Sequence, residues 1–179
     1  MSFLLKLFKL KIKHYCISIC GLDNAGKTTI IKYFIHGKQI DTVSTSGVNR
    51  ETISLPGLEI IVHDLGGQPQ FRGSWQGYNE NADAIVYVVD ATDTERMEEA
   101  KQFLDLVLTH QRKDNAPLLL LLNKVDSDDR ISADLFGQIF QLNSKDRPAL
   151  SWACFETSGL TGEGLIDSFQ WLVNKLEEA

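Results

Sequence analysis

The sequence contains little cysteine, no excess of positive charge and no long apolar run. Its three cysteines, at positions 16, 20 and 154, are too few and too odd in number for a disulfide framework, which predicts a reducing compartment. Lysine and arginine number 18 against 24 acidic residues, a net charge of −6, and this argues against a general nucleic-acid binder. Because no run of about 18 apolar residues occurs, no membrane-spanning helix is expected.

The chain is long enough for one domain, and its first residues stand apart from the rest. Its 179 residues, 43% of them hydrophobic, are expected to form a core without metal or disulfide support. Residues 1–13 carry four lysines and no acidic residue. On a helix, Lys6, Lys9 and Lys13 fall on one side, and most of the apolar residues fall on the other. Such a basic amphipathic helix is typical of a membrane-surface element, and packing against its own domain is the alternative.

From residue 14 onward, strand-like and helix-like segments alternate. Apolar alternation or continuous apolar runs predict strands at 15–20, 52–55, 58–63, 84–90, 118–122 and 152–155. Helical spacing predicts helices that end near 36 and that cover 97–108, 131–142 and 164–176. Pro56-Gly57 predicts a hairpin, whereas 37–49 and 64–79 are expected to be irregular. The alternation predicts an α/β fold of three layers: a six-stranded, mostly parallel sheet with one antiparallel edge strand, and helices on both faces.

The segment Gly21-x4-Gly26-Lys27-Thr28 matches the pattern of a phosphate-binding loop. It lies between the first predicted strand and a predicted helix, which is the context that this loop requires. Glycines there let the backbone curl, so that successive N–H groups face an anion at the start of the helix. Lys27 is expected to reach the outer phosphates, and the Thr28 hydroxyl is expected to bind Mg2+. The nucleotide-binding residues predicted in this loop are Gly21, Asp23, Asn24, Ala25, Gly26, Lys27, Thr28 and Thr29.

A second polar segment, Asp64-Leu65-Gly66-Gly67-Gln68, follows the second strand of the predicted hairpin. Asp64 at a strand end can hold Mg2+, directly or through water, and the Gly67 backbone N–H can bind a terminal phosphate. The Gln68 side chain can orient a water molecule for in-line attack, which makes it the candidate catalytic residue. Alone, this segment is equally consistent with a turn, but together with the phosphate-binding loop it indicates phosphate chemistry.

Two further segments indicate which base accompanies the phosphates. The run Asn-Lys-Val-Asp at 123–126 follows a predicted buried strand, and its Asp126 carboxylate can accept two hydrogen bonds from the N1–H and 2-amino edge of guanine. Adenine lacks this donor pair, so such a site discriminates by a factor on the order of 10^4 or more. The Thr-Ser-Gly-Leu turn at 157–160 can offer backbone N–H groups to the guanine carbonyl, and an ordinary turn before a helix is its alternative. The predicted base-binding residues are Asn123, which would brace the loops, Lys124, Asp126, Ser158, Gly159 and Leu160.

With these motifs, nearly the whole chain resembles a small GTPase of the Ras superfamily, and more closely its Arf/Sar branch. The resemblance rests on GLDNAGKTT, DLGGQ, NKVD and the basic N-terminal segment. It implies a P-loop GTPase fold in which residues 14–179 form the GTP-binding domain, and a GDP/GTP switch that uses Mg2+. It also implies that Thr45 is a second Mg2+ ligand when GTP is bound, and that Trp75 and Tyr78 lie on the second switch.

Further expectations follow from the same resemblance. The protein partners would be an exchange factor, a GTPase-activating protein and effectors, with no nucleic acid among the partners. Hydrolysis is slow at such sites unless a partner supplies an arginine. GTP binding would slide the hairpin at 50–63 and expel the N-terminal helix, which would then insert into a membrane. The chain would thus be cytoplasmic, reversibly membrane-associated and active in membrane trafficking.

The sequence also departs from the Arf pattern. Ser44 and Val48 stand where Arf proteins usually have proline and phenylalanine, and His63 stands where they have tryptophan. Those positions form much of the effector face of Arf proteins, so Arf effectors cannot be carried over to this chain. Gln68 agrees with Arf rather than Sar proteins, whereas Ser2 replaces the acylated glycine of Arf proteins, so N-myristoylation is not expected.

Other functions and roles fit parts of the sequence. The altered Ser44 and His63 leave open a nucleotide-holding scaffold with negligible hydrolysis, although the intact set Lys27, Thr28, Asp64 and Gln68 argues against it. An ATP-using kinase is a third alternative, against which the run at 123–126 argues. Arg72 is a further candidate for a hydrolytic arginine, and His63 is expected to pack at a strand end. The cysteines and tryptophans expected in the core are Cys16, Cys20, Trp152 and Trp171.

Overall fold

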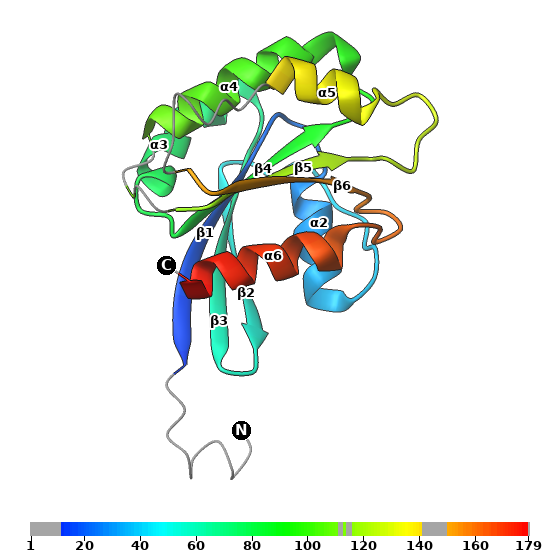
Figure 1. Cartoon of the computed structure of the whole chain (residues 1–179). Helices are drawn as coiled ribbons and strands as arrows, with labels where there is room; N and C mark the ends of the chain where they lie inside the picture. The colour runs from blue at the N-terminus through cyan, green and yellow to red at the C-terminus, as the bar shows by residue number, and fades with distance from the viewer. Residues whose placement is uncertain (1–11, 111–112, 114–115, 141–149, 179) are drawn as a thin grey trace.

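A computed structural model describes residues 12–110, 113, 116–140 and 150–178. Within these ranges, a single sheet has the strand order β2-β3-β1-β4-β5-β6 (Figure 1). β2 runs antiparallel to β3, and every other neighbouring pair is parallel. This confirms the predicted six-stranded, mostly parallel sheet with an antiparallel edge strand. The strands are β1 (Lys13–Cys20), β2 (Val48–Leu55), β3 (Leu58–Leu65), β4 (Ala84–Asp90), β5 (Leu118–Asn123) and β6 (Trp152–Thr157).

Helices cover both faces of this sheet, which confirms the three layers (Figure 1). None of the helices in the described ranges combines the length and the apolarity that a bilayer crossing requires. Short 3-10 helices, η1 (Pro69–Ser74) and η2 (Thr94–Arg96), precede two of the α-helices. On one face lie α3 (Trp75–Asn79), α4 (Met97–His110) and α5 (Ala133–Phe140), and on the other lie α2 (Lys27–His36) and α6 (Leu165–Glu178).

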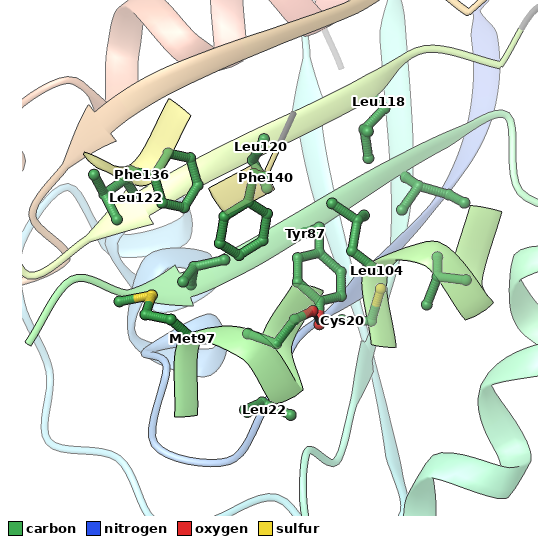
Figure 2. Packing of buried hydrophobic residues seen from close by; sticks show 14 of the residues in the cluster. Cys20, Leu22, Tyr87, Met97, Leu104, Leu118, Leu120, Leu122, Phe136 and Phe140 are labelled. Atoms are coloured by element: carbon green, nitrogen blue, oxygen red, sulfur yellow. Dashed lines mark hydrogen bonds between the residues drawn. The ribbon is translucent and has the colours of Figure 1, made fainter. Parts of the chain in front are cut away.

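The central strands are apolar because both of their faces are covered. Every residue of β4 and β5 is buried, in agreement with the apolar runs that predicted them. In Figure 2, Tyr87 and Leu120 of the sheet lie in one cluster with Leu104 of α4 and Phe140 of α5. The Tyr87 hydroxyl donates a 2.7 Å hydrogen bond to the Ala100 carbonyl, so the buried ring keeps its polar atom paired. Each large apolar side chain buried here contributes about 2 kcal/mol, which makes the sheet a firm base for the loops at its edge.

Several boundaries differ from those expected. Residues 64–79, expected to be irregular, contain η1 and α3, because Gly73 and Gly77 weaken the helical signal of this segment. β2 and β3 are longer than expected, since they pair along their whole length, from Val48 opposite Leu65 to the turn. Lys13 is the first residue of β1, whereas the preceding residues of the expected amphipathic helix, apart from Ile12, lie outside the described residues.

The expected core is wrong for some side chains. Trp152 is 40% exposed because it lies on the edge strand β6, where alternate residues point away from the core. Trp171 of α6 is half-buried. Cys20 is fully buried as expected, but Cys16 is half-buried, and its Sγ lies 3.4 Å from His63 Nδ1. The His63 ring packs edge-on against a tyrosine of α3 with 4.9 Å between ring centres, in agreement with its expected packing role.

Candidate functional site

A cleft of about 190 Å³ opens at the edge where the parallel strands end. The loops that follow β1, β3 and β5 line it, together with the loop that precedes β2. Ligands of open α/β sheets bind at this edge, because the loops after parallel strands converge there. The cleft therefore brings together the predicted phosphate-binding loop, the loop that carries Thr45 (the first switch), the segment that carries Gly67 and Gln68 (the second switch) and part of the predicted base site. Its lining residues are Asp23, Asn24, Gly26, Lys27, Thr28, Thr29, Thr42, Val43, Ser44, Thr45, Gly67, Gln68 and Lys124.

The phosphate-binding loop leaves β1 and enters α2 at Lys27. Gly26 has a left-handed backbone with φ 94°, and a side chain there would lie 2.3 Å from the Asn123 amide, so glycine is required. Lys27 is 5% exposed, and its ammonium donates to the Gly21 and Leu22 carbonyls at 2.9 and 2.8 Å. Burial lowers the pKa of Lys27 to about 8, and the negative charge of a bound phosphate would stabilise the protonated form.

Two hydroxyls and a carboxylate meet at the start of α2. Thr28 Oγ1 donates to Asp64 Oδ2 at 2.6 Å, and the Thr45 hydroxyl lies 2.8 Å from Thr28 Oγ1 and 3.2 Å from the same carboxylate oxygen. Burial raises the pKa of Asp64, although the two hydroxyls oppose this shift. Its second oxygen, Oδ1, is buried and has no hydrogen-bond partner among the described residues. Mg2+ prefers oxygen ligands of this kind, so this group of residues could hold the ion.

Gly67 of the second switch touches the phosphate-binding loop. A Cβ added to Gly67 would lie 2.3 Å from the Asp23 nitrogen, so this close approach also requires glycine. The preceding residue, Gly66, donates its N–H to the Gly47 carbonyl at 2.8 Å, which ties the segment to the loop before β2. The Gln68 side chain lines the cleft, and its Oε1 accepts a 2.8 Å hydrogen bond from the glutamine side chain two positions later, in η1. The predicted catalytic residue therefore lies beside the phosphate-binding loop.

The Asn123 side chain joins the phosphate-binding loop to the predicted base site. It is buried, donates to the Ala25 carbonyl at 2.8 Å and accepts from the Gly159 N–H at 3.0 Å. Asn123 thus links the two loops in this structure. Asp126 and Leu160 are exposed near these loops and lie outside the cleft lining, so their contacts to a base stay predictions.

Lys124 is held by a residue to which the sequence analysis assigned no role. Its ammonium donates to Asp90 Oδ2 at 2.6 Å, and the other oxygen of Asp90 accepts from the Thr92 N–H and hydroxyl. One feature of the sequence could have indicated this role, because Asp90 is an acidic residue at the end of a buried strand. Neighbouring parallel strands end at the same edge of a sheet, so Asp90 was bound to lie near the residues that follow β5. On the next loop, the buried Ser158 hydroxyl accepts from the Leu160 N–H at 3.2 Å, which orders that turn.

Comparison with known proteins decides the family. The sequence profile of the ADP-ribosylation factor (Arf) family matches residues 1–176. The chain belongs to the Arf family. This Arf-family protein is 39% identical over 176 residues to ADP-ribosylation factor-like protein 2 of Drosophila melanogaster, which is 97% of this chain and 94% of that protein. It is 36% identical to the protein of the same name from Arabidopsis thaliana, over 97% of this chain and 93% of that protein.

A solved structure agrees with this assignment. The Arl6 (BBS3) small GTPase of Trypanosoma brucei, with the bound nucleotide analogue GppNp, is 31% identical to this Arf-family protein with a TM-score of 0.83. The match covers 93% of this chain and 99% of that one. The resemblance to the Arf and Arf-like proteins is therefore confirmed, and with it the GTPase fold.

Membership in the family settles the broad activity. The Arf-family protein is a small GTPase: it binds guanine nucleotide and hydrolyses GTP, as members of this family do. Arf-family GTPases work with exchange factors, GTPase-activating proteins and effectors. This activity favours the hydrolysing switch over the scaffold and the ATP-using kinase that the sequence alone left open.

Proposed function

We propose that this Arf-family GTPase is a GDP/GTP switch that senses the terminal phosphate through Thr45 and Gly67. The position of Thr45 supports the proposal. Its hydroxyl lies 2.8 Å from the Thr28 hydroxyl although the two residues are 17 positions apart, and 3.2 Å from Asp64 Oδ2. The loop that carries Thr45 is thus drawn onto the candidate metal ligands, which is the arrangement expected when GTP is bound.

The residues of the cleft supply the chemistry that the switch requires. Mg2+, held by Thr28 and Thr45, would offset the negative charge of the outer phosphates. Lys27 adds positive charge to the same phosphates, and the Gly67 N–H binds the terminal one. Gln68 orients the attacking water. Loss of the terminal phosphate then releases Thr45 and Gly67 together, which changes the surface that partners bind.

We further propose that the nucleotide controls membrane attachment through the N-terminal segment that precedes β1, as a step in membrane trafficking. The Lys13 N–H donates to the Gly57 carbonyl at 3.0 Å, and Lys13 pairs with Leu58, so the N-terminal segment leaves the domain beside the β2–β3 turn. The β2–β3 hairpin connects the loop before β2 with the second switch, and β3 pairs with β1. A movement of the two switches would therefore shift the hairpin, and with it the turn that contacts the start of β1. A basic segment with an apolar side suits an anionic membrane surface.

Vesicle flotation tests the membrane part of the proposal. The full chain loaded with a non-hydrolysable GTP analogue should float with phosphatidylcholine–phosphatidylserine vesicles, whereas the GDP form should stay in solution. After deletion of residues 1–11, neither the GDP form nor the GTP-analogue form should float, while nucleotide binding is retained. Equal flotation of the GDP form, the GTP-analogue form and the shortened chain would contradict the proposed coupling.

Single-turnover phosphate release tests the switch itself. The wild-type protein should release phosphate slowly, and faster when a GTPase-activating protein is added. Gln68→Leu should remain in the GTP form under both conditions, because it removes the side chain that orients water. Unaltered activator-stimulated turnover in Gln68→Leu would remove Gln68 from the mechanism.

A further inference from the structure

One buried arginine joins the second switch to both the phosphate-binding loop and α4. Arg72 lies on η1 with 7% of its side chain exposed. Its Nε donates to the Gly67 carbonyl at 2.7 Å, and its Nη1 donates to Glu99 Oε1 at 2.6 Å. Its Nη2 lies 3.6 Å from Asp23 Oδ1, and its guanidinium carbon lies 4.3 Å from the centre of the Phe103 ring. The guanidinium therefore contacts three separate parts of the molecule at once.

We propose that Arg72 is a positioning residue for GTP hydrolysis, because it fixes the peptide between Gly67 and Gln68. The Gly67 carbonyl that Arg72 holds belongs to the same planar peptide as the Gln68 N–H. Trp75 acts on the preceding peptide in the same way, since its Nε1 donates to the Gly66 carbonyl at 3.0 Å. The Gly67 N–H belongs to that peptide and points in the opposite direction from the carbonyl. Side chains of η1 and α3 thus orient both peptides that flank Gly67.

The same arginine compensates a charge in the phosphate-binding loop. Asp23 places a carboxylate where a triphosphate binds, and its negative charge opposes binding unless a cation lies nearby. Arg96 Nη1 donates to Asp23 Oδ1 at 3.0 Å, and Arg72 contacts the same oxygen. Arg96 also pairs with Asp93 close to it on the chain, whereas Arg72 reaches across to Gly67. Of these two arginines, it is therefore Arg72 that contacts both the Asp23 carboxylate and the second switch, so a movement of the switch would also move the cation beside Asp23.

These contacts also exclude the role that the sequence suggested for Arg72. A hydrolytic arginine must place its guanidinium on the phosphates. The guanidinium of Arg72 is committed to a carbonyl and two carboxylates and lies over an aromatic ring, so it is not free for that purpose. The inference rests on the proposed switch, in which a partner supplies the positive charge and Arg72 keeps the second switch in place.

Arg72→Lys tests the inference, because lysine keeps the charge but cannot hold the three groups in one planar fork. The single-turnover rate of GTP hydrolysis should fall about tenfold or more when these hydrogen bonds are lost. The affinity for GDP should stay within about twofold, because Gly67 and Gln68 act on the terminal phosphate. Arg96→Lys is the matched control: it shares the Asp23 contact but lies on η2, and its hydrolysis rate should stay within about twofold of wild type.

Trp75 provides a second readout that does not depend on turnover. It is 2% exposed and packs edge-on against Phe103 at 6.0 Å, on the ring that Arg72 covers. In a chain that also carries Trp152→Phe and Trp171→Phe, its fluorescence reports the second switch alone. Exchange of GDP for a non-hydrolysable GTP analogue should change this fluorescence when Arg72 is present. The change should be much smaller in Arg72→Lys.

The outcomes separate the inference from the proposed function. Loss of hydrolysis and of the Trp75 response in Arg72→Lys, with GDP affinity retained, supports the inference. Wild-type hydrolysis and fluorescence in that variant overturn it. A parallel fall in hydrolysis, GDP affinity and Tm also overturns it, because that pattern marks a general structural defect. If the wild-type protein itself hydrolyses no GTP, the proposed switch fails, and the Trp75 response alone decides the role of Arg72.

Discussion

Replacement of Asn123 by alanine tests the link between the two halves of the nucleotide site. Asn123 is 2% exposed, and its side chain bonds the Ala25 carbonyl at 2.8 Å, the Gly159 N–H at 3.0 Å and the Thr157 hydroxyl at 3.4 Å. Alanine leaves the buried carbonyl and the buried N–H without partners, at about 1–3 kcal/mol for each. The combined loss is then about 2–6 kcal/mol. That loss corresponds to roughly 30-fold up to the order of 10^4-fold in an equilibrium constant.

This loss should divide between folding and nucleotide affinity, because the link both stabilises the free protein and positions two loops for the nucleotide. Chemical denaturation without nucleotide, followed by circular dichroism, measures the first share. Equilibrium binding of a fluorescent GDP measures the second. Thr157→Val is the matched control, since it removes only the 3.4 Å contact and should cost less than about 1 kcal/mol.

Two results would refute this reasoning. One is a combined loss in Asn123→Ala below about 1 kcal/mol. The other is an equal loss in Thr157→Val, because the bonds to Ala25 and Gly159 would then contribute nothing. Asn123→Asp refines the test, because it keeps the acceptor for the Gly159 N–H but places a carboxylate oxygen against the Ala25 carbonyl. Its combined free-energy loss should be at least as large as the part that the hydrogen bond to Ala25 contributes.

Three further variants extend these tests. Gly67→Ala places a Cβ 2.3 Å from the Asp23 nitrogen, so single-turnover hydrolysis should fall about a hundredfold as the second switch shifts. Unchanged hydrolysis would show that this contact is not needed. Ser18→Ala removes a buried hydroxyl that lacks a partner among the described residues, so the free energy of unfolding in urea should rise by about 1 kcal/mol. A decrease would contradict that reading of Ser18. Burial, and after it the charge of Arg50, lowers the pKa of His63. As the pH falls below the ordinary histidine pKa, His63 is protonated in the unfolded chain before it is protonated in the folded protein, so the free energy of unfolding should decrease. An NMR titration should place the pKa of His63 below about 6.5 and should show it rise in Arg50→Gln; an ordinary value in the unaltered protein would disagree.

Much of the fold was predictable because the relevant signals are local. Strands β4 and β5 are uninterrupted apolar runs, and such runs mark strands that are covered on both faces. Pro56-Gly57 predicted the turn that the structure places between Leu55 and Leu58. The phosphate-binding loop was equally accessible, since its glycines and Lys27 lie within a few consecutive residues. These features need no knowledge of distant parts of the chain.

The rest depends on neighbours in space that the order of residues does not reveal. Asp90 and Lys124 are 34 positions apart, and only the pairing of β4 with β5 brings their side chains together. The contact between Arg72 and Glu99 requires η1 to lie against α4, and the sequence predicted no helix for η1. Trp152 was assigned to the core by its chemistry alone, because the position of β6 at the edge of the sheet is a property of the whole topology.

The order of the strands has a consequence for how such proteins diversify. The antiparallel hairpin, with Val48 and His63, occupies one border of the sheet, whereas the Asn123 brace stands near the opposite border. Substitutions can therefore accumulate along the hairpin border without reaching the predicted base-binding residues. After gene duplication, the copies can in this way come to bind different effectors while all of them still bind the same nucleotide.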